Sequence, residues 1–344
     1  MSQIATMGEG HTPVVESIRI GPRRGLRLFF KMELFNPSGS YKDRFAAAET
    51  TYFLKHNVAA CVATSSGNTG AALAAYCARY EIACSIFVNE HAPSGKLNQM
   101  QKFGARIFRV KGFATSPDVT RKVYQRLQKI AAENSIPIVV SAYRYCPEGM
   151  RGVEEIGTEL SEKTHSGFDH IFVPVGGGGL FTAISRGIAR AGSSQTKIHA
   201  VQPEGCSTVV SAFEDGRDEI LPVTSTTRVS GLAVPFDIDA GACLAELRRA
   251  GGRGIAVTDQ EVFTAQRQMI QEEGIWCEPA GAAALAGCLR ACDREWIKPG
   301  ESAVCIVSGH GFKDTDSLLA IPDGHAVADI DESQIGELLR EVHR

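Results

Sequence analysis

A lysine stands where a glycine-containing turn becomes a helix, in the stretch "LFNPSGSYKDRFAAAE" of residues 34–49. Turn-forming residues precede Lys42, and good helix formers follow it. An amine there can act as a covalent nucleophile once burial or a neighbouring cation lowers its pKa. Arg44 lies close in sequence and is a candidate for that cation. The alternative interpretation is an ordinary helix start with charges near its end.

Four successive glycines separate an apolar run from a helical pattern in "VPVGGGGLFTAISRG". Glycines let the backbone approach a ligand, and the start of the following helix adds positive potential, so the pattern predicts a phosphate-binding loop. The loop lacks the Gly-Lys-Ser/Thr of a nucleotide P-loop and the spacing of a dinucleotide fingerprint. The phosphate is therefore expected to belong to something other than ATP or NAD. The alternative is a flexible turn. The four residues are Gly176, Gly177, Gly178 and Gly179.

Two other polar loops follow apolar runs. In "SSGNTGAALAAY", Ser65, Ser66, Asn68 and Thr69 can bind a carboxylate or a phenolic oxygen, although Asn68 and Thr69 can equally be helix caps. In "CIVSGHGFKD", Ser308 ends an apolar run and offers one neutral hydrogen bond. A lysine nucleophile, a phosphate loop without a nucleotide motif and a hydroxyl at a strand end together suggest pyridoxal 5'-phosphate, whose aldehyde bonds to lysine.

The elements that must position these residues alternate between strand and helix. Val/Ile-rich runs such as "ACSIFVN", "HIFVPV", "KIHAVQP" and "SAVCIVSG" are typical of buried parallel strands. Amphipathic or alanine-rich segments such as "PDVTRKVYQRLQKIAAEN" and "PAGAAALAGCLRAC" lie between them. This alternation over some 250 residues predicts an α/β protein with a parallel sheet covered by helices on both faces. Ligands bind beyond the carboxyl ends of such strands, where the three polar loops lie.

Composition narrows the class of function. The 344 residues carry a net charge of −3, which gives no general attraction to nucleic acid or acidic membranes. We see neither a signal-peptide pattern nor an apolar run long enough to cross a bilayer, and we expect a cytoplasmic protein. The ten cysteines include no Cys-x-x-Cys pair, so we interpret them as buried small hydrophobic residues and expect no metal site.

The motifs together resemble the fold type II pyridoxal-phosphate enzymes, which include threonine synthases, cysteine synthases and serine and threonine dehydratases. The resemblance runs from "GEGHTP" (8–13) to "SGHGFKD" (308–314), and "NPSGSYKDR", "SSGNTG" and "GGGGL" lie in the family's order. It implies two open, mostly parallel twisted sheets with helices on both faces, pyridoxal 5'-phosphate as cofactor and an amino acid as substrate.

The resemblance also implies a role for each candidate residue. Lys42 would bond to the cofactor's aldehyde, Asn68 would bind its phenolic oxygen, and Ser308 would face its ring nitrogen. The four glycines would hold the cofactor's phosphate. The remaining hydroxyl-bearing candidates of the "SSGNTG" loop, which are Ser65, Ser66 and Thr69, would face the substrate carboxylate, and Arg144 would bind the substrate.

Threonine synthases are the most similar members, by "GEGHTP" and "SGHGFKD". Such an enzyme converts O-phosphohomoserine and water to threonine and phosphate. The segment "VVSAYRYCPEG" (139–149) departs from the pattern, because Ser141-Ala142 replaces an Asn-Pro of the substrate-phosphate pocket. "SGLAVP" (230–235) is similar to a dehydratase segment. A β-replacing enzyme of the cysteine synthase type, or a serine/threonine dehydratase, is therefore the alternative.

The resemblance further implies a division of the chain. Residues 1–47 with 146–325 would form the large cofactor-binding domain, residues 48–145 a smaller, mobile domain on the substrate side, and residues 326–344 a C-terminal tail. Members of the family are usually homodimers, so we expect a homodimer.

Overall fold

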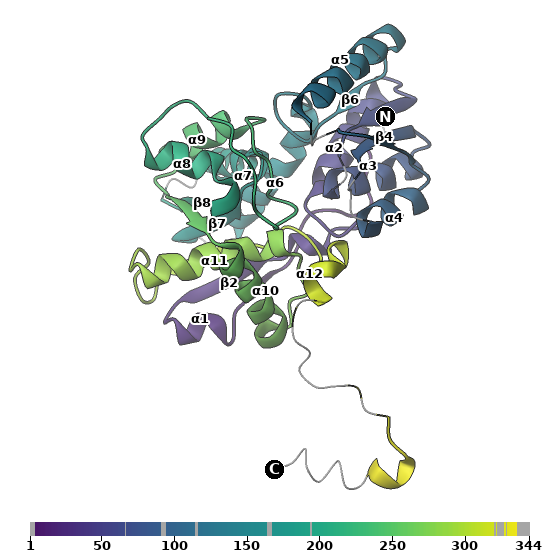
Figure 1. The fold of residues 1–344 in the computed structure, drawn as a ribbon. Coiled ribbons are helices and arrows are strands. Elements are labelled where there is room, and N and C mark those ends of the chain that lie inside the picture. Colours follow the sequence, from purple (N-terminus) through teal and green to yellow (C-terminus); the bar gives the residue numbers. More distant parts are fainter. Residues whose placement is uncertain are drawn as a thin grey trace.

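The computed structural model describes residues 4–65, 67–90, 94–113, 116–163, 167–192, 195–319, 321, 327 and 329–335, with the backbone alone for 94–96 and 117. It contains two α/β units that lie side by side (Figure 1). Each unit is built on its own open sheet, one of six strands and one of four. The fold class expected from the sequence, two mostly parallel sheets with helices packed on them, is confirmed.

The six-stranded sheet has the order β1-β2-β10-β7-β8-β9, and only the β1–β2 pair is antiparallel. Strands β7 and β10 are buried along their whole length, which explains why their sequences are continuous apolar runs. In the order of the sheet, the strands are β1 (Val14–Glu16), β2 (Arg27–Lys31), β10 (Ser302–Ile306), β7 (His170–Pro174), β8 (Lys197–Pro203) and β9 (Gly254–Val257).

The four-stranded sheet has the order β5-β4-β3-β6 and is parallel throughout. Its strands are β5 (Arg106–Val110), β4 (Ala83–Asn89), β3 (Ala60–Ala63) and β6 (Ile138–Val139). All of them fall within the predicted smaller domain of residues 48–145, and the strands of the larger sheet fall outside it. The domain boundaries themselves, and the mobility of the smaller unit, stay predictions.

The helices connect these strands and pack on the sheets (Figure 1). They are α1 (Ile20–Arg23), α2 (Lys42–Lys55), α3 (Asn68–Arg79), α4 (Ser94–Lys102), α5 (Pro117–Asn134), α6 (Pro147–Glu162), α7 (Gly179–Arg190), α8 (Thr208–Glu214), α9 (Ala240–Arg249), α10 (Asp259–Glu273), α11 (Pro279–Asp293) and α12 (Thr315–Leu319). Short 3₁₀ turns occur at Glu33–Phe35, Glu204–Cys206, Gly311–Lys313 and Glu332–Gln334.

Glycines on α6 determine how closely the site-bearing helices approach. A Cβ at Gly152 would clash with the Arg44 carbonyl of α2, and a Cβ at Gly157 would clash with the Ile184 carbonyl of α7. Helix α6 is therefore in close contact with α2, which begins at Lys42, and with α7, which follows the four glycines. The small residues thus hold the lysine and the glycine loop at a fixed separation.

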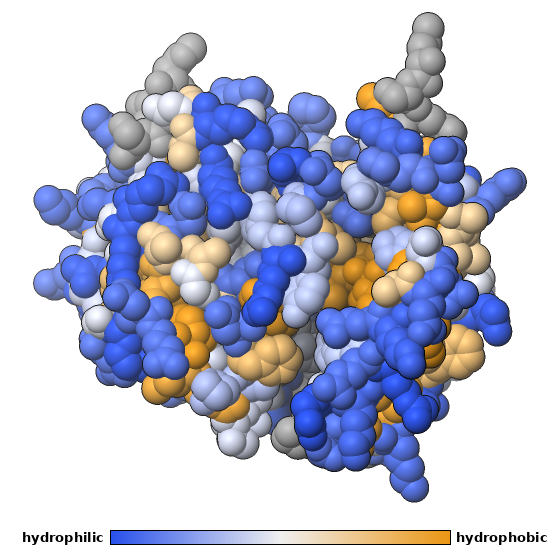
Figure 2. All heavy atoms as spheres, turned by 90° about the horizontal axis from the view of Figure 1, so that it is seen from above, coloured by the Kyte–Doolittle hydropathy of each residue, from blue (hydrophilic) through white to orange (hydrophobic). Residues whose placement is uncertain are grey.

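No helix among the described residues is long and apolar enough to cross a membrane. The face shown in Figure 2 is mainly hydrophilic, with apolar residues in separate patches. The tail predicted at 326–344 lies mostly outside the described residues.

Candidate active site

The turn before Lys42 is held against the exit of β10. Gly39 has φ +89°, a left-handed conformation that suits glycine, and its carbonyl accepts a hydrogen bond from His310 N (2.9 Å). Tyr41 N donates to the Ser308 carbonyl at 3.1 Å. These contacts between segments far apart in the sequence place the start of α2 beside Ser308, which is buried.

The Lys42 amine donates a hydrogen bond to Ser141 Oγ at 2.7 Å. Burial lowers the pKa of Lys42 to about 7, and the negative charge of Asp239 opposes that shift. A substantial fraction of the amine is thus neutral near pH 7, as a nucleophile or general base requires. Among the described lysines whose pKa is shifted, Lys42 is therefore the one best suited to covalent chemistry.

The role expected for Arg44 is wrong. Its guanidinium is buried and bonds both carboxylate oxygens of Glu33 and of Glu159, at 2.6–2.8 Å. Arg44 is not among the causes of the lowered Lys42 pKa, which comes from burial. Closeness in sequence does not place Arg44 beside the Lys42 amine, because residues two apart on a helix point to different sides.

The four glycines form the turn between β7 and α7. Gly178 has φ +97°, and a Cβ there would lie 2.6 Å from the Asp239 carbonyl oxygen. A Cβ on Gly176 would lie 3.1 Å from the Gly231 carbonyl oxygen. The loop is therefore a side-chain-free backbone turn that leads into the N-terminus of a twelve-residue helix, and a phosphate group fits such a turn.

Asp239 connects this loop to the segment after β6. Its carboxylate accepts hydrogen bonds from Tyr143 N (2.7 Å) and Arg144 N (3.3 Å). The carboxylate is buried, and burial raises its pKa, which these bonds and the Lys42 charge counteract. The sequence interpretation missed Asp239, since a single acidic residue near a helix start is ordinary.

Asn68 begins α3, and its Nδ2 donates to Glu278 Oε1 at 2.6 Å. Asn68 Oδ1 is buried and has no hydrogen-bond partner among the described residues. Gly67, not Asn68 or Thr69, is the N-cap, and no side chain caps the helix, so the capping alternative is wrong. Buried Glu278, just before α11, was also missed by the sequence interpretation.

Thr69 and Lys42 contact the same side chain, Ser141. Thr69 Oγ1 is 2.8 Å from Ser141 Oγ, the atom that Lys42 contacts. The Ser65 hydroxyl accepts from Gly67 N at 3.2 Å, and Ser66 lies outside the described residues. Arg144 is exposed and approaches Asp239 only through its backbone among the contacts of the described residues. The structure thus joins Lys42 and Thr69 through Ser141.

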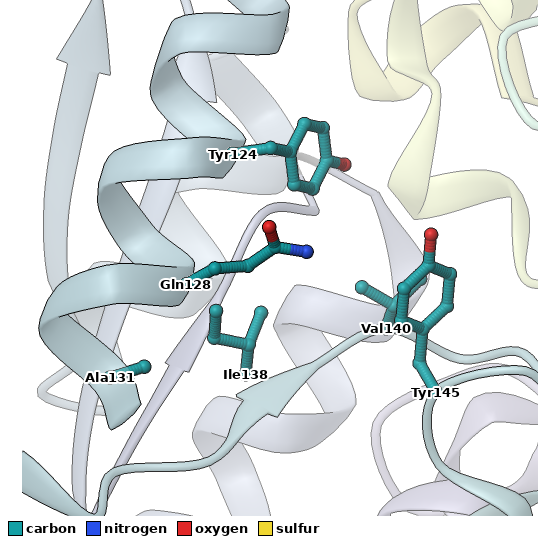
Figure 3. A pocket seen from close by; sticks show the side chains of 6 residues that line it. All are labelled: Tyr124, Gln128, Ala131, Ile138, Val140 and Tyr145. Atoms are coloured by element: carbon teal, nitrogen blue, oxygen red, sulfur yellow. The ribbon is translucent and has the colours of Figure 1, made fainter. Parts of the chain in front are cut away.

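A cavity of about 260 Å³ lies at the carboxyl end of β6 (Figure 3). Tyr124 OH is 3.2 Å from Thr64 Oγ1, which follows β3, so the cavity adjoins the loop that carries Ser65. None of the described residues that line it carries a charge. They are Tyr124, Gln128 and Ala131 from α5, Ile138 from β6, and Val140 and Tyr145 from the following segment.

The cysteines are buried except for Cys292, which is half-buried. Three of them nevertheless gather: the Sγ atoms of Cys61, Cys77 and Cys84 lie within 4.8 Å of one another. Their sequence spacing gave no sign of this, because β3, β4 and α3 bring them together.

Comparisons with known proteins show the family of this chain. The family model "Pyridoxal-phosphate dependent enzyme" matches residues 5–309. The chain is 30% identical to a threonine synthase from Methanocaldococcus jannaschii, over 99% of this chain and 84% of that protein. It is 31% identical to a threonine synthase from Methanosarcina acetivorans, over 97% and 82% respectively.

A solved structure of maize serine racemase superposes with a TM-score of 0.76 at 24% identity, covering 97% of this chain and 94% of that one. That likeness concerns the fold. The family match shows the cofactor, pyridoxal 5'-phosphate, and the glycine loop, the lysine with a pKa of about 7 and the buried Asn68 oxygen suit it. The chain belongs to the pyridoxal-phosphate dependent enzyme family.

Proposed function

We propose that this chain catalyses elimination and readdition on an amino acid, and that its reaction converts O-phosphohomoserine and water to threonine and phosphate. The observation that carries the proposal is the Lys42 amine, with a pKa of about 7, in contact with the 141–144 segment and through it with Thr69. The 30–31% identity to threonine synthases over nearly the full chain supports the choice of substrate.

The residues divide the work of holding the cofactor. Lys42 would hold its aldehyde carbon and the backbone of the four glycines its phosphate. Asn68 would bind its phenolic oxygen, and Ser308 would bind its ring nitrogen. The chemistry that the cofactor supplies when bound is electron withdrawal from the α-carbon of the amino acid. A serine hydroxyl carries no negative charge, so Ser308 at the ring nitrogen would favour expulsion of a leaving group over transamination.

The side chains around the substrate move and hold the proton. As general base, the Lys42 amine would take the proton from the α-carbon and later return it. Asp239, whose charge favours the protonated amine, stabilises Lys42 after the transfer. Hydroxyls of Ser65, Ser66 and Thr69 bind the substrate carboxylate, and Arg144 binds the leaving group.

A second candidate is a β-replacement or dehydratase reaction on a serine-like substrate. The segment 139–149 favours it, because Ser141-Ala142 stands where threonine synthases carry an Asn-Pro of the substrate-phosphate pocket. Arg151, on the neighbouring helix α6, does not provide a free cation there, because it pairs with Glu148 on the surface.

The test is to incubate the cofactor-loaded protein with O-phosphohomoserine and to quantify phosphate and threonine. We expect equal amounts of both, and none from Lys42→Ala. Lys55→Ala, on the exposed far end of the same helix, should behave as wild type. Absence of phosphate from wild type, with turnover of O-phosphoserine, O-acetylserine, serine or threonine instead, would establish the second candidate.

A further inference from the structure

Ser141 lies where the side chains of three separate elements meet. Its Oγ is 2.7 Å from Lys42 Nζ at the start of α2 and 2.8 Å from Thr69 Oγ1 in the first turn of α3. A serine hydroxyl has one donor and two acceptor sites. It can therefore accept from the lysine amine and donate to the threonine hydroxyl at the same time, which leaves no polar atom of the trio without a partner.

The segment that carries Ser141 is fixed by hydrogen bonds to Asp239, which lies in the unit with the six-stranded sheet. Strand β6 ends at Val139, and Ala142 N donates to the Val140 carbonyl at 2.7 Å, so the chain turns sharply at Ser141. The Asp239 carboxylate then fixes the next two backbone N–H groups, those of Tyr143 and Arg144. The position of the hydroxyl is thus determined by backbone contacts on both sides of it, and not by the lysine alone.

We propose that Ser141 is a positioning residue that holds the Lys42 amine at the reacting carbon and favours its protonated form. A buried ammonium needs acceptors for its N–H groups, and Ser141 Oγ touches it directly. Ser141 itself gives up and takes up no proton: the proton that Lys42 takes from the α-carbon stays on Nζ, hydrogen-bonded to Oγ, until Lys42 returns it. The inference rests on the proposed role of Lys42 and is independent of the substrate.

A pH series of Lys42 labelling tests this on the protein without cofactor or substrate. A small amine-acylating reagent modifies only the neutral amine, and mass spectrometry of the Lys42 peptide reports the midpoint. Wild type should show a midpoint of about 7. Ser141→Ala removes an acceptor of the charged form, so the midpoint should fall by about one pH unit. Ser141→Thr keeps the hydroxyl and should keep the midpoint.

Ser161→Ala is the matched control, since Ser161 is a half-buried serine on α6 whose Oγ donates, among the described residues, to the Gly157 carbonyl of its own helix. It should leave the midpoint unchanged. If Ser141→Ala does not fold, Ser141→Gly, which also lacks the hydroxyl, should lower the midpoint in its place. A wild-type midpoint in the folded alanine or glycine variant, or an equal fall in Ser141→Thr, would overturn the proposal.

The same variants separate this inference from the proposed function. A lowered midpoint in Ser141→Ala, in a protein that releases no phosphate from O-phosphohomoserine, supports the positioning role and rejects only the substrate. In the active enzyme, Ser141→Ala should lower kcat at least about tenfold at pH 7 with little change in KM, because it disturbs proton transfer.

Discussion

At the scale of single residues, the protonation of Lys42 decides the chemistry. Burial disfavours its charged form and the Asp239 carboxylate favours it, with burial the larger effect. The amine is therefore poised near neutral pH, where it can both attack a carbonyl carbon and accept a proton. The protonation state of the amine thus depends on Lys42 and Asp239, which are 197 positions apart in the chain.

Replacing Asp239 with Asn should lower the pKa of Lys42 further. The neutral amide removes the charge that favours the ammonium, so the acidic limb of the kcat/KM profile should move to lower pH by about one unit. Asp237→Asn is the control, because Asp237 binds the backbone at the start of α9 through an oxygen that Asn retains. Equal profiles for Asp239→Asn and wild type would show that this carboxylate does not act on Lys42.

At the scale of elements, the turn into α7 depends on backbone that a side chain would block. A Cβ at position 178 would clash with the Asp239 carbonyl. The backbone there is also left-handed, with φ +97°, which residues other than glycine rarely adopt. Sequence alone predicted the loop, but not which glycine is indispensable, since that follows from the chain packed behind it.

Gly178→Ala should weaken binding of the cofactor at least about tenfold, because the clash displaces the loop and the left-handed conformation costs about 1–2 kcal/mol. Gly192→Ala bears a similar conformational cost, with φ +78° and open space at Cβ. It should bind the cofactor like wild type in a fluorescence titration. Comparable affinity in both variants would contradict the phosphate role of the loop.

A buried charge cluster anchors α2 behind Lys42. Glu159 accepts from Arg44 and from Lys31, and these cations hold its pKa near 2 despite burial. Glu159→Gln leaves the cations under-compensated, so the free energy of unfolding in urea should fall by about 3–5 kcal/mol at pH 7. Glu162→Gln, exposed one turn further along α6, should change it by less than about 0.5 kcal/mol.

The pH dependence of this difference has a definite sign. Because the pKa of Glu159 is lowered from 4.5 to about 2 in the folded protein, its contribution is present above pH 4.5 and is lost as the pH falls toward 2. Wild type and Glu159→Gln should therefore converge in stability at acid pH. A difference that stays constant down to pH 3 would mean that the cluster acts through shape and not charge.

At the scale of the whole molecule, the sequence predicted the helices and strands whose local patterns are clear. The spans expected for β4, α5 and β8 agree with the structure, as periodicity and apolar runs define them. Neither β9, a strand of four residues, nor α9, a helix of ten residues, was predicted. The contacts of Ser141 with Lys42 and of Glu278 with Asn68 were beyond its reach, because they join residues 99 and 210 positions apart.

The expected homodimer remains a prediction. Trp276 and Phe312 are 40% and 70% exposed, and their ring centroids lie 6.0 Å apart beside the exit of β10. Exposed aromatic pairs of this kind are common at protein interfaces. Sedimentation equilibrium of the loaded protein would give the mass directly, and a monomer at all accessible concentrations would contradict the expectation.

The most direct test of the central claim is to locate the cofactor on the chain. The loaded protein is reduced with borohydride, digested, and analysed by mass spectrometry. The account predicts the reduced cofactor on the Lys42 peptide, with none on Lys42→Ala. Attachment to a different lysine, or a loaded protein from which borohydride fixes no cofactor at all, would contradict it.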